Sequence, residues 1–550
     1  MNLKKYVWLF LAMLLPLGFV ACSDSDEPAR EPEVIGGQEE NKKDYYTFEE
    51  AYINQFCFGQ MSYYYLWWKD INTSNWFLGD DPVKKVKSIR YEEDEWTSAI
   101  EDISSYIDNS TTTYGYDYQP YWADENKTHV VAVITMVYPE SPAEKVGLKR
   151  GSVIMQMDGR YIENKNEDYN KLSSSASLDL SVYDPETKMT KEVKMTSTDM
   201  YLDPVLFEKV FDCGGKKVGY LYFNDFNSDK SGARLIEVAK KFKQEGVTEL
   251  VLDLRYNGGG YVIIEELLLS LLAPEVNVNN GDLYQTAIYN DSPYSKDLKE
   301  DEGEDYVNSY FKTNFEWVRK SKDENGKDIT KEYSYNTSDA NMNLNKIYAL
   351  VSNQSASASE ATLVSLMPFM DVEVIGKQTG AKHCTGVMLT AEGYYEYQEA
   401  LLEYYKALKD DDDFIELKEI LEQYYKEQSE FIKPFSAWKD YVGKWGLYVM
   451  VSTYADKNGN NPCRPNGIVP DIEIKDNPQE PYPLGDDREA MLRVALTEAG
   501  YTDFTPLPEA KSRALTSSLG EAIPMKSEGK RMLLKPERPM NFSSRSLRMK

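Results

Sequence analysis

The spacing of apolar residues changes several times along this chain, and each change predicts a different kind of element. In residues 45–112, apolar and aromatic residues recur every three or four positions, as in FEEAYINQFCFGQMSYYYLWWKDI, which is typical of packed helices. In residues 113–198, short apolar runs (HVVAVITMVY, SVIMQMDG, LDLSVYD and KEVKMTS) alternate with turn residues. The pattern predicts a small helical N-terminal domain followed by a strand-rich domain.

Residues 199–480 alternate between strand-like and helix-like patterns. Apolar runs such as VTELVLDLRYN and NKIYALVSN are typical of buried strands, and the longer segments between them have helical periodicity. Polar stretches at 275–340 and 391–443 interrupt this order, so we expect a lid or subdomain insertion at the first and an inserted helical pair at the second. The expected fold class is α/β (α+β), in several domains.

The two ends of the chain have different compositions from the middle. Residues 1–22 carry two lysines, then an apolar run that ends at Ala21-Cys22, which is typical of a lipoprotein signal peptide with Cys22 as the lipidated residue. Residues 23–44 are polar and predict a tether. Residues 481–510 predict a C-terminal helical segment. Residues 511–550 hold ten Lys or Arg against three Glu without apolar periodicity, which predicts a disordered tail.

Charge and cysteine content narrow the function. The net charge of −29 excludes the general electrostatic attraction that a nucleic-acid partner requires. Besides Cys22 there are four cysteines, none in a Cys-x-x-Cys pair, and only two histidines, so we expect no metal and no cofactor. In an exported protein the four cysteines allow up to two disulfides, whose pairing the sequence leaves open.

A serine-rich stretch, SNQSASASEA (352–361), follows one of the buried strands and precedes a helical pattern. Backbone N–H groups at a helix N-terminus favour developing negative charge, and small neighbours allow close approach of a substrate. The stretch therefore fits either an acyl-transfer nucleophile or an ordinary serine N-cap.

A nucleophilic serine needs a base, and few residues can supply it. The histidines are His129, in a predicted strand, and His383, which follows Lys382 in TGAKHCTG. A lysine serves as base at neutral pH only if its pKa falls by about three from about 10.4, at a cost near 4 kcal/mol. The surrounding segment is short of acids and rich in small residues, which suits such a lysine. The same segment also fits an ordinary lysine in a surface loop.

Four motifs occur in the order seen in a known family: SASASE, a lysine 25 residues after Ser357, DLRYNGGG and GIVPDI. They resemble the C-terminal processing peptidases (tail-specific proteases) of serine peptidase family S41, whose catalytic core is crotonase-like (ClpP/crotonase type). The preceding segment, SPAEKVGLKRGSVIMQMDG, resembles a PDZ domain. The resemblance covers Ser141 to Ile472 and leaves the helical N-terminal segment, the 391–443 insertion and the basic tail outside it.

The resemblance implies roles for particular residues. Ser357 would be the nucleophile and Lys382 the general base, and backbone N–H groups of Gly258 or Gly259 with Ala358 would form the oxyanion hole. Supporting roles fall on Glu360, Asp253 and Arg255, and a PDZ carboxylate nest would lie at Gly115 and Tyr116.

The same resemblance implies a serine endopeptidase that cleaves exported proteins with free, unstructured C-terminal tails. It would be anchored by its lipid in the bacterial cell envelope, at the periplasmic face of the outer membrane or at the cell surface. The alternative is a peptide-binding lipoprotein with weak or no catalysis, because Gly386 stands where many relatives have the Gln that holds the lysine, and Pro368 where many have Asp. A Cys384–Cys463 disulfide is a further hypothesis.

Overall fold

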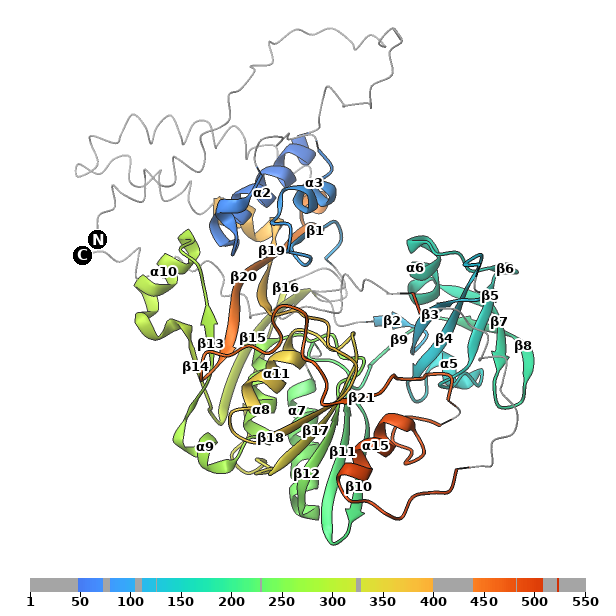
Figure 1. Cartoon of the computed structure of the whole chain (residues 1–550). Coiled ribbons are helices and arrows are strands. Elements are labelled where there is room, and N and C mark those ends of the chain that lie inside the picture. Colours follow the sequence, from blue (N-terminus) through green and yellow to red (C-terminus); the bar gives the residue numbers. More distant parts are fainter. Residues whose placement is uncertain are drawn as a thin grey trace, which may run out of the picture.

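The computed structural model describes residues 48–72, 80–103, 111–124, 126–227, 230–322, 328–398, 439–480, 482–507 and 522–523. The predicted signal peptide, Cys22, the tether, and most of the 391–443 insertion and of the tail lie outside the described residues. Figure 1 shows a central α/β core, a second sheet with the N-terminal helices above it, and a separate β-rich domain to one side.

The core is built on a six-stranded sheet. Its strand order is β10 (Val205–Cys213), β11 (Lys216–Phe223), β12 (Val247–Asp253), β17 (Lys346–Val351), β18 (Asp371–Gly376) and β21 (Ile472–Glu473). The β10–β11 pair is antiparallel and all other neighbours are parallel. Leu250 and Leu252 pack on one face of the sheet and Val251 on the other, so both faces are buried and the strands have continuous apolar runs.

Helices cover both faces of this sheet. One face packs against α7 (Ser231–Glu245), α8 (Val262–Leu272) and α11 (Ala358–Leu366), and the other against α15 (Ala490–Glu498). Helix α11 follows β17 after a six-residue turn, residues 352–357, in which the serine-rich stretch begins. The mixed α/β fold predicted from the alternating pattern is thus present. Helix α11 begins beyond the carboxyl end of the parallel strand β17, where α/β folds form their binding and active sites.

The second sheet joins segments that are far apart in the sequence. Its strands are β1 (Ser98–Ile100), β20 (Gly446–Asp456), β13 (Leu283–Ile288), β14 (Asn308–Tyr310) and β19 (Cys384–Thr390). Helices α2 (Phe48–Tyr64) and α3 (Pro82–Ile89) share one apolar cluster with β19 and β20. The helices predicted within 45–112 are therefore packed against this second sheet, which buries their apolar face.

Residues 275–322 and 328–340 form helices and strands. They contain α9 (Glu275–Asn280), β13, α10 (Pro293–Glu302), η2 (Glu304–Val307), β14, β15 (Asn314–Lys322) and β16 (Asp328–Asn336). Strand β13 pairs with β20, and the β15–β16 hairpin buries Phe315 and Trp317 in the core cluster. Of the two expectations, the subdomain insertion fits these contacts better than a lid.

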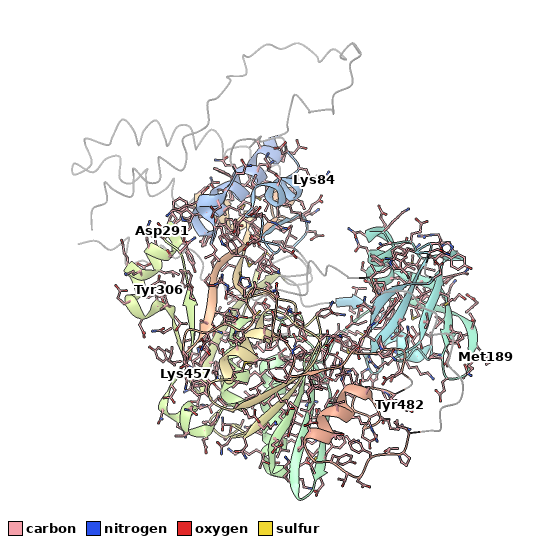
Figure 2. The ribbon with its side chains drawn as sticks, in the orientation of Figure 1. Lys84, Met189, Asp291, Tyr306, Lys457 and Tyr482 are labelled. Carbon is pink, nitrogen blue, oxygen red and sulfur yellow. The ribbon has the colours of Figure 1, made fainter. Side chains whose placement is uncertain are left out.

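The β-rich domain has a six-stranded sheet and two short helices. Its elements are β2 (Thr111–Thr113), β3 (Tyr116–Trp122), β4 (Val130–Val137), α5 (Pro142–Lys145), β5 (Val153–Met157), β6 (Arg160–Tyr161), α6 (Asn166–Ser174), β7 (Ser177–Asp184), β8 (Met189–Thr196) and β9 (Thr198–Met200). Ser141 caps α5, as its sequence predicts, by accepting a hydrogen bond from the Glu144 N–H at 3.1 Å. Figure 2 shows Met189 at the outer tip of the β7–β8 hairpin, which points away from the core.

Two expectations from the sequence are wrong. All four described cysteines are free and buried, so the Cys384–Cys463 disulfide is absent, and the Cys463 thiol instead interacts with the Glu360 carboxylate. The prediction of disorder throughout 511–550 also fails in part, because Ala522 and Ile523 pair with β3 and Ile523 is buried. Two apolar residues are too few to produce the periodicity that predicts a strand.

Candidate active site

Ser357 lies at the N-terminus of α11 in a strained conformation. Its φ of 63° is rare for a non-glycine residue and persists only where surrounding contacts impose it. The side chain is fully buried. The Glu360 N–H approaches Oγ in a capping-box arrangement but without the geometry of a hydrogen bond, so this buried hydroxyl has no hydrogen-bond partner among the described residues. A strained strand-to-helix turn that presents an uncommitted hydroxyl is typical of a nucleophilic serine.

The carboxylate of Glu360 connects Ser357 to Lys382. Its Oε2 accepts hydrogen bonds from the Ser357 N–H at 3.0 Å and from the Lys382 N–H at 2.9 Å, so these two nitrogens lie within about 6 Å of each other. Its Oε1 accepts from the Ala381 N–H at 2.8 Å and from the Thr379 hydroxyl. Burial raises the pKa of Glu360, and the converging donors oppose this by favouring the carboxylate. One buried side chain therefore fixes the distance between the two predicted catalytic segments.

Lys382 is buried and its amine is positioned by Tyr448. The Nζ atom donates a hydrogen bond to the Tyr448 hydroxyl at 3.0 Å and lies 4.8 Å from the ring centroid. Tyr448 belongs to β20, which pairs with β19, the strand that directly follows Lys382. A neutral phenol positions the amine without adding a negative charge that would stabilise the ammonium form.

Gly386 makes room for that tyrosine. A Cβ atom at Gly386 would lie 2.5 Å from Tyr448 Cζ and 2.5 Å from Met450 Cε, closer than side chains tolerate. The position where many relatives have Gln is therefore filled by the Tyr448 ring from the neighbouring strand. Gly386, the departure that favours the non-catalytic alternative, is thus accompanied by Tyr448, which holds the lysine amine.

The glycine-rich turn after β12 packs directly on the nucleophile. A Cβ atom at Gly259 would lie 2.7 Å from the Ser357 Cβ, which only glycine avoids. The Gly259 N–H donates to Asn257 Oδ1 at 2.9 Å and so is already committed. Among the hydrogen bonds of the described residues, none uses the N–H of Gly258 or of Ala358. Of the three predicted oxyanion-hole groups, Gly258 and Ala358 are thus the two with amides that remain available.

Asn257 joins the glycine turn to the serine turn, a role the sequence analysis missed. Its carbonyl accepts from the Ala356 N–H at 3.2 Å and from the Ser359 hydroxyl at 2.9 Å, and its Nδ2 donates to the Phe223 carbonyl at 2.9 Å. Tyr448 and Thr379 were also missed. The sequence offered a signal for Asn257, because an Asn directly before glycines, as in RYNGGG, is typical of a side chain that stabilises a turn.

Asp253 and Arg255 lie beneath the turn within a buried ionic network. The Arg255 guanidinium contacts Asp253 at 2.8 Å, Glu489 at 2.8 Å and Asp476 at 2.9 Å. Burial raises the pKa of Asp253. Burial also acts to raise the pKa values of Asp476 and Glu489, but the arginines outweigh it and hold both below their usual range. None of these contacts involves Ser357 or Lys382, which agrees with a structural role.

The remaining candidates are arranged as follows. The Gly115 N–H donates to the Thr113 hydroxyl at 3.1 Å, and the Tyr116 hydroxyl donates to the Leu172 carbonyl at 2.7 Å, so the Gly115 amide is not offered to a carboxylate. His129 stacks on Tyr161 in the β-rich domain, with ring centroids 4.5 Å apart. The described residues contain no cluster suited to a metal ion and no helix long and apolar enough to cross a membrane.

Comparison with known proteins identifies the core. Residues 217–420 match the family model of peptidase family S41. This segment, just over a third of the chain, is similar to peptidase family S41. The matched segment contains Ser357, Lys382, Glu360 and the glycine-rich turn, whereas Tyr448 follows it.

The individual relatives that match this chain are distant from it. The carboxy-terminal processing protease CtpB of Bacillus subtilis is 26% identical over 160 residues, which cover 27% of this chain and 33% of that protein. A probable CtpA-like serine protease of Staphylococcus aureus is 27% identical over 140 residues, which cover 25% of this chain and 27% of that protein. The match thus spans about a third or less of these relatives' length.

A solved structure extends the similarity to the fold as a whole. The crystal structure of a putative S41 protease from Bacteroides fragilis aligns with a TM-score of 0.55 at 22% identity, and covers 86% of this chain and all of that one. At this identity the similarity establishes a shared fold over most of the chain and nothing further.

Proposed function

We propose that this protein is a serine endopeptidase that uses Ser357 and Lys382 as a catalytic dyad. The observation that carries the proposal is the Glu360 carboxylate, because it binds the backbone N–H groups of both residues within one buried cluster. The strained, uncommitted Ser357 hydroxyl and the buried lysine are the two components that acyl transfer needs.

Acylation would begin with attack of Ser357 Oγ on the scissile carbonyl carbon while Lys382 Nζ accepts the hydroxyl proton. The negative charge that forms on the carbonyl oxygen would be bound by the N–H groups of Gly258 and Ala358. As the C–N bond breaks, the Lys382 ammonium returns the proton to the leaving amine. Water activated by the neutral lysine then attacks the ester carbonyl and releases Ser357.

The amine must remain in place while its charge changes. The Tyr448 hydroxyl supports this because its oxygen accepts a hydrogen bond from the amine or the ammonium. The lysine can serve as base only in its neutral form, which an enclosed site favours over the ammonium. Tyr448 therefore does in this chain what a Gln at position 386 does in many relatives.

We propose substrates that are exported proteins with unstructured C-terminal tails, presented by a PDZ-type β-rich domain. Lipidation at Cys22 would anchor the enzyme to a membrane of the bacterial cell envelope. Its partners there would be proteins or peptides with free C-termini. The names of the relatives, which include a carboxy-terminal processing protease, support this substrate class.

The test uses an exported model protein with an apolar, unstructured C-terminal extension. Wild type is expected to cleave it, and Ser357→Ala and Lys382→Ala to lower kcat/KM at least 1,000-fold while the folded state is retained, in the range seen for other catalytic groups. Glu237→Gln, at an exposed position on α7, serves as the control that retains activity. Equal inertness of wild type and both variants across many such substrates would instead favour the non-catalytic peptide-binding lipoprotein.

A further inference from the structure

The free edge of the β-rich sheet carries a segment from the C-terminal region of the chain. Strand β3 ends the sheet order, and Ala522 pairs with Tyr121 of β3 in antiparallel fashion. The Ile523 N–H donates to the Pro120 carbonyl at 2.8 Å. The Ile523 side chain is only 7% exposed and packs in the cluster that contains Tyr118. The segment is thus seated on this edge by backbone bonds and by an apolar anchor.

The edge compensates for a missing donor at this position. Pro120 has no N–H, so a strand paired with it finds an acceptor but no backbone donor. The Gln119 Nε2 supplies that donor and binds the Ile523 carbonyl at 2.7 Å. Both the N–H and the carbonyl of Ile523 are therefore hydrogen-bonded to β3 residues. A chance contact would not need to pair both groups.

The same glutamine contacts the serine turn. The Gln119 Oε1 accepts a hydrogen bond from Gln354 Nε2 at 3.0 Å, and Gln354 lies three residues before Ser357. A strand on β3 and the nucleophile turn are consequently joined through a single side chain.

We propose that the free edge of β3 is a docking site for an extended segment with an apolar residue at the Ile523 position, and that Ala522–Ile523 of the same chain is its resident occupant. Charge complementarity supports an internal occupant: residues 511–550 carry ten Lys or Arg and three Glu, on a chain of net charge −29. Resting on the proposed function, a substrate strand displaces Ala522–Ile523 before it is cleaved.

Binding is tested in the full-length chain carrying Ser357→Ala, so that the result does not depend on catalysis. The probe is a fluorescent synthetic peptide with residues 516–529 of this sequence. It is expected to bind the additional variant Ile523→Asp at least tenfold more tightly than the Ser357→Ala parent, because the mutated segment leaves the edge open. Leu507→Asp, an apolar-to-acidic change at an exposed site, is the matched control and should bind like the parent. Equal binding to all three proteins would overturn the proposal.

A cross-link provides the second measurement and detects docking without mutation of Ile523. Tyr121 and Ala522 form a non-hydrogen-bonded antiparallel pair, flanked by the Ile523–Pro120 bond, in which side chains lie close enough for a disulfide. Under oxidising conditions the pair Tyr121→Cys/Ala522→Cys should form an intramolecular disulfide detectable by peptide mass spectrometry. The pair Tyr121→Cys/Leu507→Cys should not. Absence of the first cross-link in folded protein would also overturn the proposal.

Discussion

At the scale of single residues, the site depends on an exchange of side chains between neighbouring strands. Tyr448 of β20 holds the amine of Lys382, and Gly386 of β19 leaves the space that its ring occupies. The pairing of these strands is irregular between Thr385 and Gly386, which brings Gly386 opposite Met450. The lysine is therefore held by a residue 66 positions later in the chain.

We predict that Tyr448→Phe lowers kcat about tenfold with little change in KM, because it removes one hydrogen bond worth about 1–1.5 kcal/mol and keeps the ring. Tyr448→Ala should lower kcat further, since the amine also loses the ring beside it. In Tyr448→Ala/Gly386→Gln, the Gln enters the vacated space and should restore part of kcat. Steady-state kinetics on one tailed substrate measure all three.

The control for this series is Tyr52→Phe, which removes a buried hydroxyl bonded to Gln398 at 2.9 Å in the same apolar cluster but away from the site. It should retain kcat. If Tyr448→Phe and Tyr52→Phe behave alike, the positioning role of Tyr448 is refuted.

Sequence alone was sufficient to select Ser357 and Lys382 as candidates, since the scarcity of histidine and the order of four motifs restricted the choice. It was insufficient for Tyr448, one of 42 tyrosines. Its contact with Lys382 follows from the β19–β20 register and a local irregularity, which no local pattern around Tyr448 encodes. The sequence therefore left open what holds the Lys382 amine when Gly stands at position 386.

At the scale of elements, Glu360 fixes the start of α11 against the segment that precedes β19. It lies in the first turn of the helix, where a carboxylate is also favoured by the helix dipole. Its two oxygens accept from three backbone N–H groups and one hydroxyl, drawn from both elements. The carboxylate acts as a joint between the nucleophile and the base.

We predict that Glu360→Gln lowers both activity and stability. A glutamine has a single acceptor oxygen and places an NH₂ donor against N–H groups that need an acceptor, so buried donors lose their partners at about 1–3 kcal/mol each. We expect kcat/KM to fall at least 100-fold and the free energy of unfolding to fall by about 2–4 kcal/mol. Chemical denaturation and kinetics on the same preparation measure the two effects.

The exposed Glu237→Gln variant is again the control and should alter neither quantity. Retention of full activity by Glu360→Gln would show that the carboxylate does not set the distance between the two segments. At this scale the sequence predicted the helix and the two strands around the site and gave Glu360 a supporting role, but the partners of its two oxygens follow from tertiary contacts that the sequence does not encode.

At the scale of the whole molecule, a buried ionic network joins the β-rich domain to the core. Arg150, from the turn before β5, contacts Asp476 at 2.7 Å and the Tyr256 hydroxyl at 2.7 Å. Asp476 follows β21 and also binds Arg255 beneath the glycine turn. The position of the β-rich domain is thereby linked to the turn that bears the predicted oxyanion-hole glycine.

We predict that this network makes the protein sensitive to acid. The lowered folded-state pKa values of Asp476 and Glu489 mean that their stabilisation is fully present above the unfolded-state values of about 3.9 and 4.3 and is lost as the pH falls through the folded-state values. Burial raises the pKa of Asp253, so the acid loss arises from the other two carboxyls. The thermal unfolding midpoint should therefore fall steeply below about pH 4.

The matched variants are Asp476→Asn, in the network, and Asp212→Asn, in an exposed pair with Lys217. Asp476→Asn should lower stability at pH 7 by about 3 kcal/mol, because breaking a buried pair leaves charge uncompensated, and should flatten the acid limb. Asp212→Asn should resemble wild type. An unchanged acid limb in Asp476→Asn would exclude this network as its cause.

The sequence predicted the order of segments but not their association. The apolar helices before residue 112 appear self-contained in the sequence, whereas their core is completed by β19 and β20, more than 270 positions later. The three-way contact of Arg150, Asp476 and Arg255 likewise spans distant segments. Periodicity reports which face of an element is buried and does not report what buries it.

The most direct test of the account is to identify the residue that becomes acylated during turnover. A peptide ester substrate is mixed with enzyme, the reaction is quenched in acid, and the modified peptide is located by mass spectrometry. We predict a single acyl group on Ser357 in wild type and none in Lys382→Ala quenched at the same time. Cleavage of substrate with the acyl group on another residue, or with no covalent intermediate under conditions where acylation is faster than hydrolysis, would contradict the Ser357–Lys382 dyad.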